Sequence, residues 1–305
     1  CHMDVLSKPE ESLQVIRTAV EAILTGTGLS EQDLLGIGYT VPAPLINDKT
    51  GEFITHYMPA WKDFCCIATI RDLIKETPIY FENDANAAAL AEKWWGCGLG
   101  YDNLVYIKLG TGVGSGLIIN DVVYRGFNGT AGEIGHTTIE ADGRQCRCGN
   151  RGCLESYIGI QGILSDGRRA LVNDQNWTGR LDELNVKGVV QAALEGNAEC
   201  EKIITTAGYY LGIGLANIIN LVDPGLLILG GELADAGQML LEPARQSLVE
   251  RTVGFNTQTD NLMIGDLGSD AVAIGAATLV IMNSFHESNI YTALRSKEQN
   301  ALINA

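Results

Sequence analysis

The sequence has few basic residues for its length, and it contains no long apolar run. Lysine and arginine together number 21, against 37 aspartates and glutamates, so the formal net charge is −16 over 305 residues. A surface this acidic repels polyphosphate, and the chain is therefore not expected to grip DNA or RNA by itself. No stretch approaches the roughly 18 apolar residues of a transmembrane helix, and no signal peptide opens the chain. We expect a cytoplasmic protein without membrane contact.

Two common phosphate-binding motifs are also absent. The glycine-rich segment 110–116 reads Gly-Thr-Gly-Val-Gly-Ser-Gly and lacks the Gly-Lys-Ser/Thr ending of a P-loop. An apolar strand, 117–119, follows it where the dinucleotide-binding fingerprint requires a helix. Strand, glycine turn and strand predict a hairpin. Its exposed amides could form an anion-binding nest, and a plain tight hairpin is an equally good interpretation.

Strands alternating with helices predict an α/β fold with a largely parallel sheet. The chain is long enough to bury a sizeable core without disulfides, and it shows no tandem repeat. The expected strands are 34–41, 79–82, 104–109, 226–229 and 262–264. The expected helices are 13–24, 86–95, 200–221, 236–251 and 271–282.

Three of the eight cysteines cluster in the middle of the chain. Cys146, Cys148 and Cys153 follow the spacing Cys-x-Cys-Gly-x-x-Gly-Cys, in which the glycines let the backbone fold tightly and the thiolates converge. This pattern favours tetrahedral zinc over three buried structural thiols. His136 is the one nearby histidine and is the candidate for the fourth ligand. Because four protein ligands leave no open position, such a zinc would be structural.

Two carboxylates flank this cluster. Glu133 precedes His136 by three residues, and Glu155 follows Cys153 by two. Carboxylates held on a rigid frame suit a polyhydroxylated ligand, because they accept hydrogen bonds from its hydroxyl groups. The alternative is that both are solvated surface residues. Their positions on either side of the metal loop favour ligand binding.

Asn83 and Asp84 stand where a strand ends and a helix begins. Asp84 is interpreted either as the N-cap of that helix or as a functional carboxylate at the carboxyl end of a strand, where α/β folds bind ligands. In the second case Asp84 would deprotonate a hydroxyl group and Asn83 would orient the same ligand. Spacing alone favours the cap.

Taken in order, these motifs resemble the ROK family, which groups sugar-responsive repressors, open reading frames of unknown role and sugar kinases. The resemblance implies an actin-like (ribonuclease H-like) two-lobed ATPase fold with a sugar in the cleft. It covers nearly the whole chain. The segments that carry it are 83–86, 110–116, 132–136, 146–155 and 229–231.

The resemblance also implies domains and residue roles. We expect a first lobe at 1–103, a second lobe with the zinc loop at 104–287, and a C-terminal tail or helix at 288–305. Asp84 would be the catalytic base, and ATP with Mg²⁺ the cosubstrate, only in a kinase. The implied zinc ligands are His136, Cys146, Cys148 and Cys153. The implied sugar-binding residues are Asn83, Asp84, Glu133, His136 and Glu155. The implied nucleotide-binding residues are Thr111, Gly112, Gly230 and Gly231.

ROK proteins normally open a lobe with a hairpin reading Asp-x-Gly-Gly-Thr, which holds ATP phosphates and magnesium, and no such string occurs here. We therefore expect a first lobe without this hairpin. The runs 91–96 and 275–280 look more like the repressors than the kinases. We interpret the chain as the sugar-sensing, oligomerising region of a repressor, a homodimer or dimer of dimers that binds a monosaccharide or amino sugar. It would reach operator DNA only through a winged helix absent from this sequence. The alternative is an ATP-dependent hexose kinase with a truncated N-terminus, so enzymatic activity stays open and is the less favoured interpretation.

Overall fold

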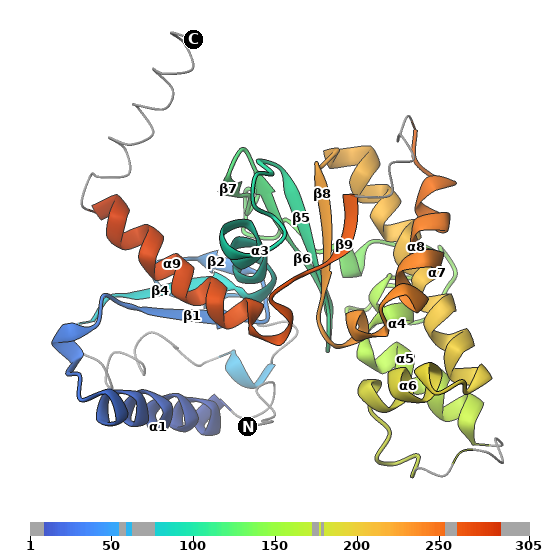
Figure 1. The fold of residues 1–305 in the computed structure, drawn as a ribbon, viewed down its shortest axis with the longest axis horizontal. Helices are drawn as coiled ribbons and strands as arrows, with labels where there is room; N and C mark the ends of the chain where they lie inside the picture. Colours follow the sequence, from blue (N-terminus) through green and yellow to red (C-terminus); the bar gives the residue numbers. More distant parts are fainter. Residues whose placement is uncertain are drawn as a thin grey trace, which may run out of the picture. The chain divides into compact units, whose positions relative to one another are not determined.

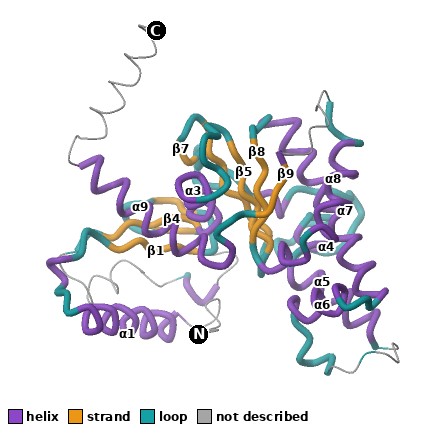
Figure 2. Tube along the Cα trace, viewed as in Figure 1, coloured by secondary structure: helices purple, strands orange, loops and turns teal. Residues whose placement is uncertain are grey.

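The computed structural model describes residues 9–54, 59–62, 77–172, 177, 180–253 and 261–287. The chain forms two compact units. Unit 1 comprises residues 1–87, 128–130 and 272–305, and unit 2 comprises 88–127 and 131–271. The lobe boundary expected after residue 103 remains a prediction, and the expected tail at 288–305 lies outside the described residues. Figure 1 colours the chain along its sequence, and Figure 2 distinguishes helices from strands.

Unit 1 is built on two parallel strands, β1 (Ile37–Val41) and β4 (Ile79–Asn83). Because the strands are parallel, their carboxyl ends lie at the same edge. Helix α9 (Ala271–Glu287) packs so closely on β1 that a Cβ atom on Gly38 would overlap the carbonyl oxygen of Ala276. The other elements of the unit are α1 (Pro9–Thr27), η1 (Glu31–Asp33), β2 (Leu45–Asn47), β3 (Glu52–Phe53) and η3 (Pro59–Trp61). Its buried apolar cluster is Val41, Ala43, Leu45, Phe53, Trp61, Ile79 and Phe81.

In the part of the chain that the structure describes, one segment, Gly268–Phe285, could cross a membrane by length and composition; it begins three residues before α9 and ends within it. Core helices of globular proteins meet the same criterion. Gly38 and Gly275 each lie against a backbone carbonyl that a side chain would overlap. For Gly38 this is the carbonyl of Ala276 in α9, and for Gly275 it is the carbonyl of Ala87. Because 33% of the segment is buried, packing inside unit 1 accounts for part of its apolar composition.

Unit 2 contains a five-stranded mixed sheet in the order β7-β6-β5-β8-β9. Strands β5 and β6 form an antiparallel hairpin, whereas β5, β8 and β9 are parallel to one another. The expected strands at 104–109, 226–229 and 262–264 are confirmed. The strand bounds are β5 (Leu104–Leu109), β6 (Val113–Ile119), β7 (Val122–Val123), β8 (Leu226–Gly230) and β9 (Leu262–Ile264).

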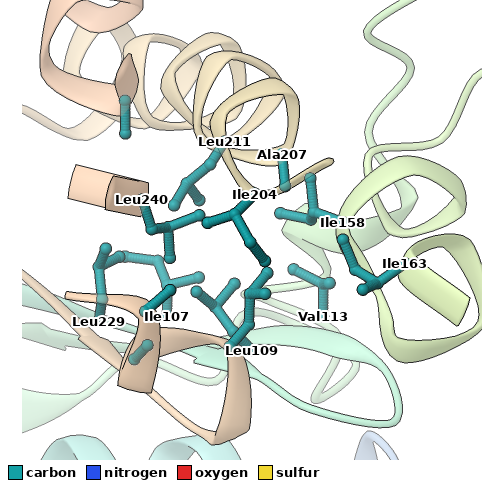
Figure 3. Close-up of a cluster of buried hydrophobic side chains, with 14 of the residues drawn as sticks. Ile107, Leu109, Val113, Ile158, Ile163, Ile204, Ala207, Leu211, Leu229 and Leu240 are labelled. Carbon is teal, nitrogen blue, oxygen red and sulfur yellow. The ribbon is translucent and has the colours of Figure 1, made fainter. Parts of the chain in front are cut away.

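The main core of unit 2 lies between one face of this sheet and a group of helices. Side chains alternate along β5, so Val105, Ile107 and Leu109 share the face that belongs to this core. Figure 3 shows Ile107 and Leu109 facing Ile204 of the long helix α7 (Ala198–Val222). Further helices described in the unit are η4 (Ile134–His136), α4 (Glu155–Ile158), α5 (Ile160–Leu171), α6 (Val186–Leu194), η5 (Glu232–Ala236), α8 (Gln238–Val249) and η7 (Gly268–Asp270).

Helices α7 and α8 lie side by side (Figure 1). A Cβ atom on Gly212 of α7 would overlap the carbonyl of Ala244 and lie 2.6 Å from Ser247 Cβ, so only glycine permits this approach. Glycine in α7 therefore allows the two helices to pack closely. The helix expected at 236–251 instead begins at Gln238, because Gly237 adopts a φ of 59° and separates α8 from the short helix η5.

Helix α3 (Asp84–Trp95) is tied to distant segments of unit 2 by one buried carboxylate. Glu92 is 0% exposed and accepts the backbone N–H groups of Cys97, Asp266 and Leu267 at 3.2, 3.3 and 3.0 Å. Cys97 Sγ also lies 3.4 Å from Glu92 Oε2. A buried acceptor with this many donors fixes the end of α3 against the segment that follows β9.

Candidate metal and ligand site

Four side chains with metal-ligand chemistry converge in unit 2. The ligand atoms of His136, Cys146, Cys148 and Cys153 all lie within 4.8 Å of one another. The Nδ1 atom of His136 is 3.7 Å from Cys146 Sγ, and the sulfur atoms of Cys148 and Cys153 are 3.6 Å apart. Zn–S bonds near 2.3 Å in a tetrahedron require ligand separations of about 3.8 Å. The donor set and its spacing therefore fit zinc.

The loop that carries the cysteines closes on itself through backbone hydrogen bonds. The N–H of Cys146 donates to the carbonyl of Asn150 at 2.8 Å, and the N–H of Gly149 donates back to the carbonyl of Cys146 at 3.1 Å. Gly149 and Gly152 adopt φ angles of 95° and 68°, in the left-handed region that other residues rarely occupy. A Cβ atom on Gly152 would also overlap the carbonyl oxygen of Glu140. The two glycines of the motif thus have a geometric role.

The environment of the cluster shifts the pKa values of its ligands. Burial raises the pKa of the Cys146 thiol, and burial with hydrogen bonds from neighbouring thiols raises the pKa of Cys153 to about 12. Burial opposes ionisation of Cys148 as well, but the N–H of Asn150 and the neighbouring thiols lower its pKa. Burial lowers the pKa of His136. A metal therefore meets a neutral imidazole and must displace protons from thiols.

Glu155 is the first residue of α4, and its side chain is only 8% exposed. Its Oε2 atom accepts the backbone N–H of Val113 at 2.9 Å. The guanidinium of Arg147 forms a bidentate ion pair with the same carboxylate, with Nε 2.7 Å from Oε1 and Nη2 3.3 Å from Oε2. The interpretation of Glu155 as a solvated surface residue is wrong. Sequence reasoning missed Arg147, although it is the x of the Cys-x-Cys motif.

Glu133 lies beside His136 at the 3-10 turn η4. Its Oε2 atom is 3.8 Å from His136 Nε2, and its side chain is 34% exposed. The two ring nitrogens of His136 therefore have different neighbours, with Nδ1 near the Cys146 sulfur and Nε2 near a carboxylate. Metal-ligating histidines commonly have their second nitrogen near such an acceptor, which orients the ring.

The glycine-rich segment forms the predicted hairpin between β5 and β6. The N–H of Gly110 donates to the carbonyl of Gly112 at 3.0 Å, and Thr111 stands at the tip of the turn. Because Glu155 accepts the Val113 amide, that N–H is not available to an anion from solution. An anion-binding nest, one of the two interpretations of this hairpin, would therefore lack the Val113 donor, which a protein carboxylate already uses.

Gly230 and Gly231 lie at the end of β8, next to the hairpin turn. Strands β5 and β8 are parallel, so Leu109 and Gly230 end their strands at the same edge of the sheet. Gly231 has a φ of 93°, and a Cβ atom there would overlap the carbonyl of Leu109. The structure thus brings the predicted nucleotide-binding residues of unit 2, including Thr111, to one edge, where α/β sheets bind ligands.

Asn83 and Asp84 belong to unit 1, at the carboxyl end of β4. The Oδ1 atom of Asn83 accepts the N–H groups of Ala85 and Asn86 at 2.9 and 3.2 Å. Asn83 is therefore the residue that caps α3, and Asp84 lies inside the first turn. The interpretation of Asp84 as the cap is wrong, because the amide oxygen of the preceding residue already satisfies those donors.

Comparisons with known proteins agree with the motifs. The family model "ROK family" matches residues 3–283. A xylose repressor of Caldicellulosiruptor bescii is 32% identical over 94% of this chain and 73% of the relative. A glucokinase of Halalkalibacterium halodurans is 36% identical over 90% of this chain and 85% of the relative. A ROK family glucokinase from Streptomyces griseus, solved in complex with glucose and AMPPNP, matches with a TM-score of 0.75 and 28% identity over 87% of each chain.

Proposed function

This chain belongs to the ROK family and has the actin-like, two-lobed α/β fold of that family, and we propose that it is the sugar-sensing and oligomerising region of a transcriptional repressor. The observation that supports sugar binding is the buried carboxylate of Glu155 beside the converged metal ligands. A fixed, ionisable acceptor next to a rigid loop suits the hydroxyl groups of a monosaccharide or amino sugar.

The proposed sugar contacts follow from the acceptor atoms. Glu155 receives two N–H donors on Oε2 and one on Oε1, which leaves Oε1 able to accept a hydroxyl group. Glu133 supplies a second carboxylate on the same unit. The ligands His136, Cys146, Cys148 and Cys153 would hold a structural zinc that keeps the loop in shape. Zinc would supply no Lewis-acid chemistry there, because its four positions are filled by the protein.

The repressor interpretation rests on likeness and on charge. The runs 91–96 and 275–280 resemble repressors, and a xylose repressor is similar over nearly the whole chain. With a net charge of −16, the chain would contact operator DNA through a separate basic part. We propose a homodimer or a dimer of dimers, because a two-fold assembly would place two DNA-reading parts on paired half-sites.

A sugar kinase is the second candidate, and one observation favours it. Asp84 stands at the carboxyl end of β4, where a carboxylate could accept the proton of a sugar hydroxyl. The glucokinase relative and the glycines at positions 110, 112, 230 and 231 agree with this interpretation. In that case ATP with Mg²⁺ would be the cosubstrate.

A coupled ADP-release assay separates the two candidates. The zinc-loaded chain is incubated with ATP, Mg²⁺ and D-glucose, D-xylose or N-acetyl-D-glucosamine, and binding of each sugar is measured by calorimetry in parallel. The proposal predicts sugar binding without turnover. Turnover of about 1–100 s⁻¹ that disappears in Asp84→Asn but persists in the control Asp48→Asn, an exposed aspartate, would establish the kinase.

A further inference from the structure

Arg147 connects the metal loop to the carboxylate of Glu155. It stands between Cys146 and Cys148, so the positions of two metal ligands determine where its backbone lies. Its guanidinium approaches Glu155 side-on, with Nε 2.7 Å from Oε1 and Nη2 3.3 Å from Oε2. A planar fork of this kind fixes the orientation of a carboxylate as well as its charge.

The same carboxylate also contacts the glycine-rich hairpin. Glu155 Oε2 accepts the N–H of Val113, the first residue of β6. A Cβ atom on Gly112 would lie 2.7 Å from Glu155 Oε2 and 2.9 Å from Arg147 Nη2. The ion pair therefore packs directly on the hairpin backbone, and a Cβ atom at position 112 would force one or both of the two side chains to move.

We infer that Arg147 is a positioning residue that couples the metal loop, through Glu155, to the hairpin at Gly112 and Val113. The hairpin residue Val113 is 42 positions from Glu155 in the sequence, and this chain of contacts joins it to the metal loop within unit 2. When metal fixes Cys146 and Cys148, Arg147 is held against Glu155, and Glu155 is held on the Val113 amide. Without metal the loop loses its cross-link, and both contacts loosen together.

The pairing also sets how Glu155 can meet a ligand. Arg147 is 44% exposed and Glu155 is 8% exposed, so the arginine forms the solvent-facing side of the pair. Three of the roughly four acceptor positions of the carboxylate are occupied by N–H donors, and the remaining one is on Oε1. Arg147 thus presents a single, oriented acceptor. This consequence for sugar binding rests on the proposed function.

The coupling is tested without any sugar. Hydrogen exchange of the Val113 amide is measured by NMR in zinc-loaded and chelator-stripped protein, for the unchanged chain, Arg147→Gln and Arg147→Lys. Arg151→Gln is the matched control, because Arg151 lies in the same loop and donates to the carbonyl of Gly143 instead. Zinc content is measured for each variant.

We expect zinc to remain in Arg147→Gln while the Val113 amide exchanges about tenfold faster, the scale of losing one charge-assisted hydrogen bond. Arg147→Lys should be intermediate, because one charged donor replaces the fork. Stripping zinc should accelerate exchange in the unchanged chain and in Arg151→Gln, but add little in Arg147→Gln. Unchanged exchange in Arg147→Gln would overturn the inference. Loss of zinc in that variant would also overturn the inference, because Arg147 would then be needed for metal binding itself and would not link the bound metal to the Val113 amide.

The second measurement is the affinity for D-glucose and D-xylose in the same zinc-loaded proteins. The dissociation constant of whichever sugar binds should rise about tenfold in Arg147→Gln and stay unchanged in Arg151→Gln. An equal affinity in Arg147→Gln would refute the role toward ligand. If neither sugar binds the unchanged chain, the proposed function fails for these ligands, and the Val113 exchange data still decide the coupling.

Discussion

Val113 donates its backbone N–H to Glu155 Oε2 at 2.9 Å, across 42 positions of sequence. This bond holds the start of β6 against the start of α4. The cysteine loop lies between these two residues in the sequence. The candidate metal ligands and the candidate sugar carboxylate therefore share one frame. Predictions about metal content, loop geometry and ligand binding are accordingly linked.

The first prediction concerns metal content. Protein purified without added metal should contain one zinc per chain, because four ligand atoms of the right chemistry already lie within 4.8 Å of one another. Cys148→Ser should lose it, as a hydroxyl is a poor replacement for a thiolate. Cys97→Ser is the control, because Cys97 contacts Glu92 and is not among the converging ligands. Elemental analysis decides, and unchanged zinc in Cys148→Ser would contradict the assignment.

The second prediction is a pH dependence of zinc affinity. The pKa values of Cys146 and Cys153 are raised, the latter to about 12, so both thiols are protonated at neutral pH before metal binds. The lowered pKa of His136 leaves its imidazole neutral and contributes no proton. Zinc binding should therefore release at least the protons of Cys146 and Cys153, and apparent affinity should rise with pH. Titration in weakly buffered solution measures the release, and a pH-independent affinity would contradict it.

The third prediction separates two glycines of one loop. Gly152→Ala introduces a Cβ atom that overlaps the Glu140 carbonyl, in addition to a φ of 68°, and should prevent the loop from closing. Gly149 has a φ of 95°, but a Cβ atom added there would meet nothing within 4 Å, so Gly149→Ala should cost only about 1 kcal/mol. Urea unfolding and zinc retention should show a severe defect in Gly152→Ala alone. Equal effects of both substitutions would refute the claim that the Glu140 carbonyl makes glycine necessary at position 152.

The fourth prediction concerns the buried carboxylate of Glu92. Both of its oxygens accept hydrogen bonds, and glutamine offers one acceptor oxygen and turns an NH₂ group toward backbone N–H donors. Glu92→Gln should therefore lower the free energy of unfolding by about 2 kcal/mol. The exposed Glu195→Gln, which keeps its acceptor for Gln191, should change it little. Denaturant unfolding compares them, and equal stabilities would show that Glu92 is dispensable.

Sequence patterns predicted the parts of the site that depend on local spacing. The Cys-x-Cys-Gly-x-x-Gly-Cys spacing identified the convergent thiols, and a glycine-rich turn between two apolar strands identified the hairpin. The contacts of Arg147 with Glu155, and of Glu92 with Leu267, were not predictable in this way. Glu92 and Leu267 are 175 positions apart, and Arg147 meets Glu155 only because the cysteine loop folds back on itself; neither contact leaves a periodic signal in the sequence. The capping of α3 was missed because Asn83 and Asp84 are both good caps, and only the backbone geometry selects Asn83.

Sugar recognition by Glu155 is tested most directly by a calorimetric titration of the zinc-loaded chain with D-glucose and D-xylose, repeated with Glu155→Gln and with the exposed control Glu195→Gln. We predict one binding site per chain for at least one of these sugars, an affinity unchanged in Glu195→Gln, and a loss of about tenfold or more in Glu155→Gln with zinc still bound. Sugar binding of equal affinity in Glu155→Gln would contradict the claim that the carboxylate framed by the metal loop recognises the ligand.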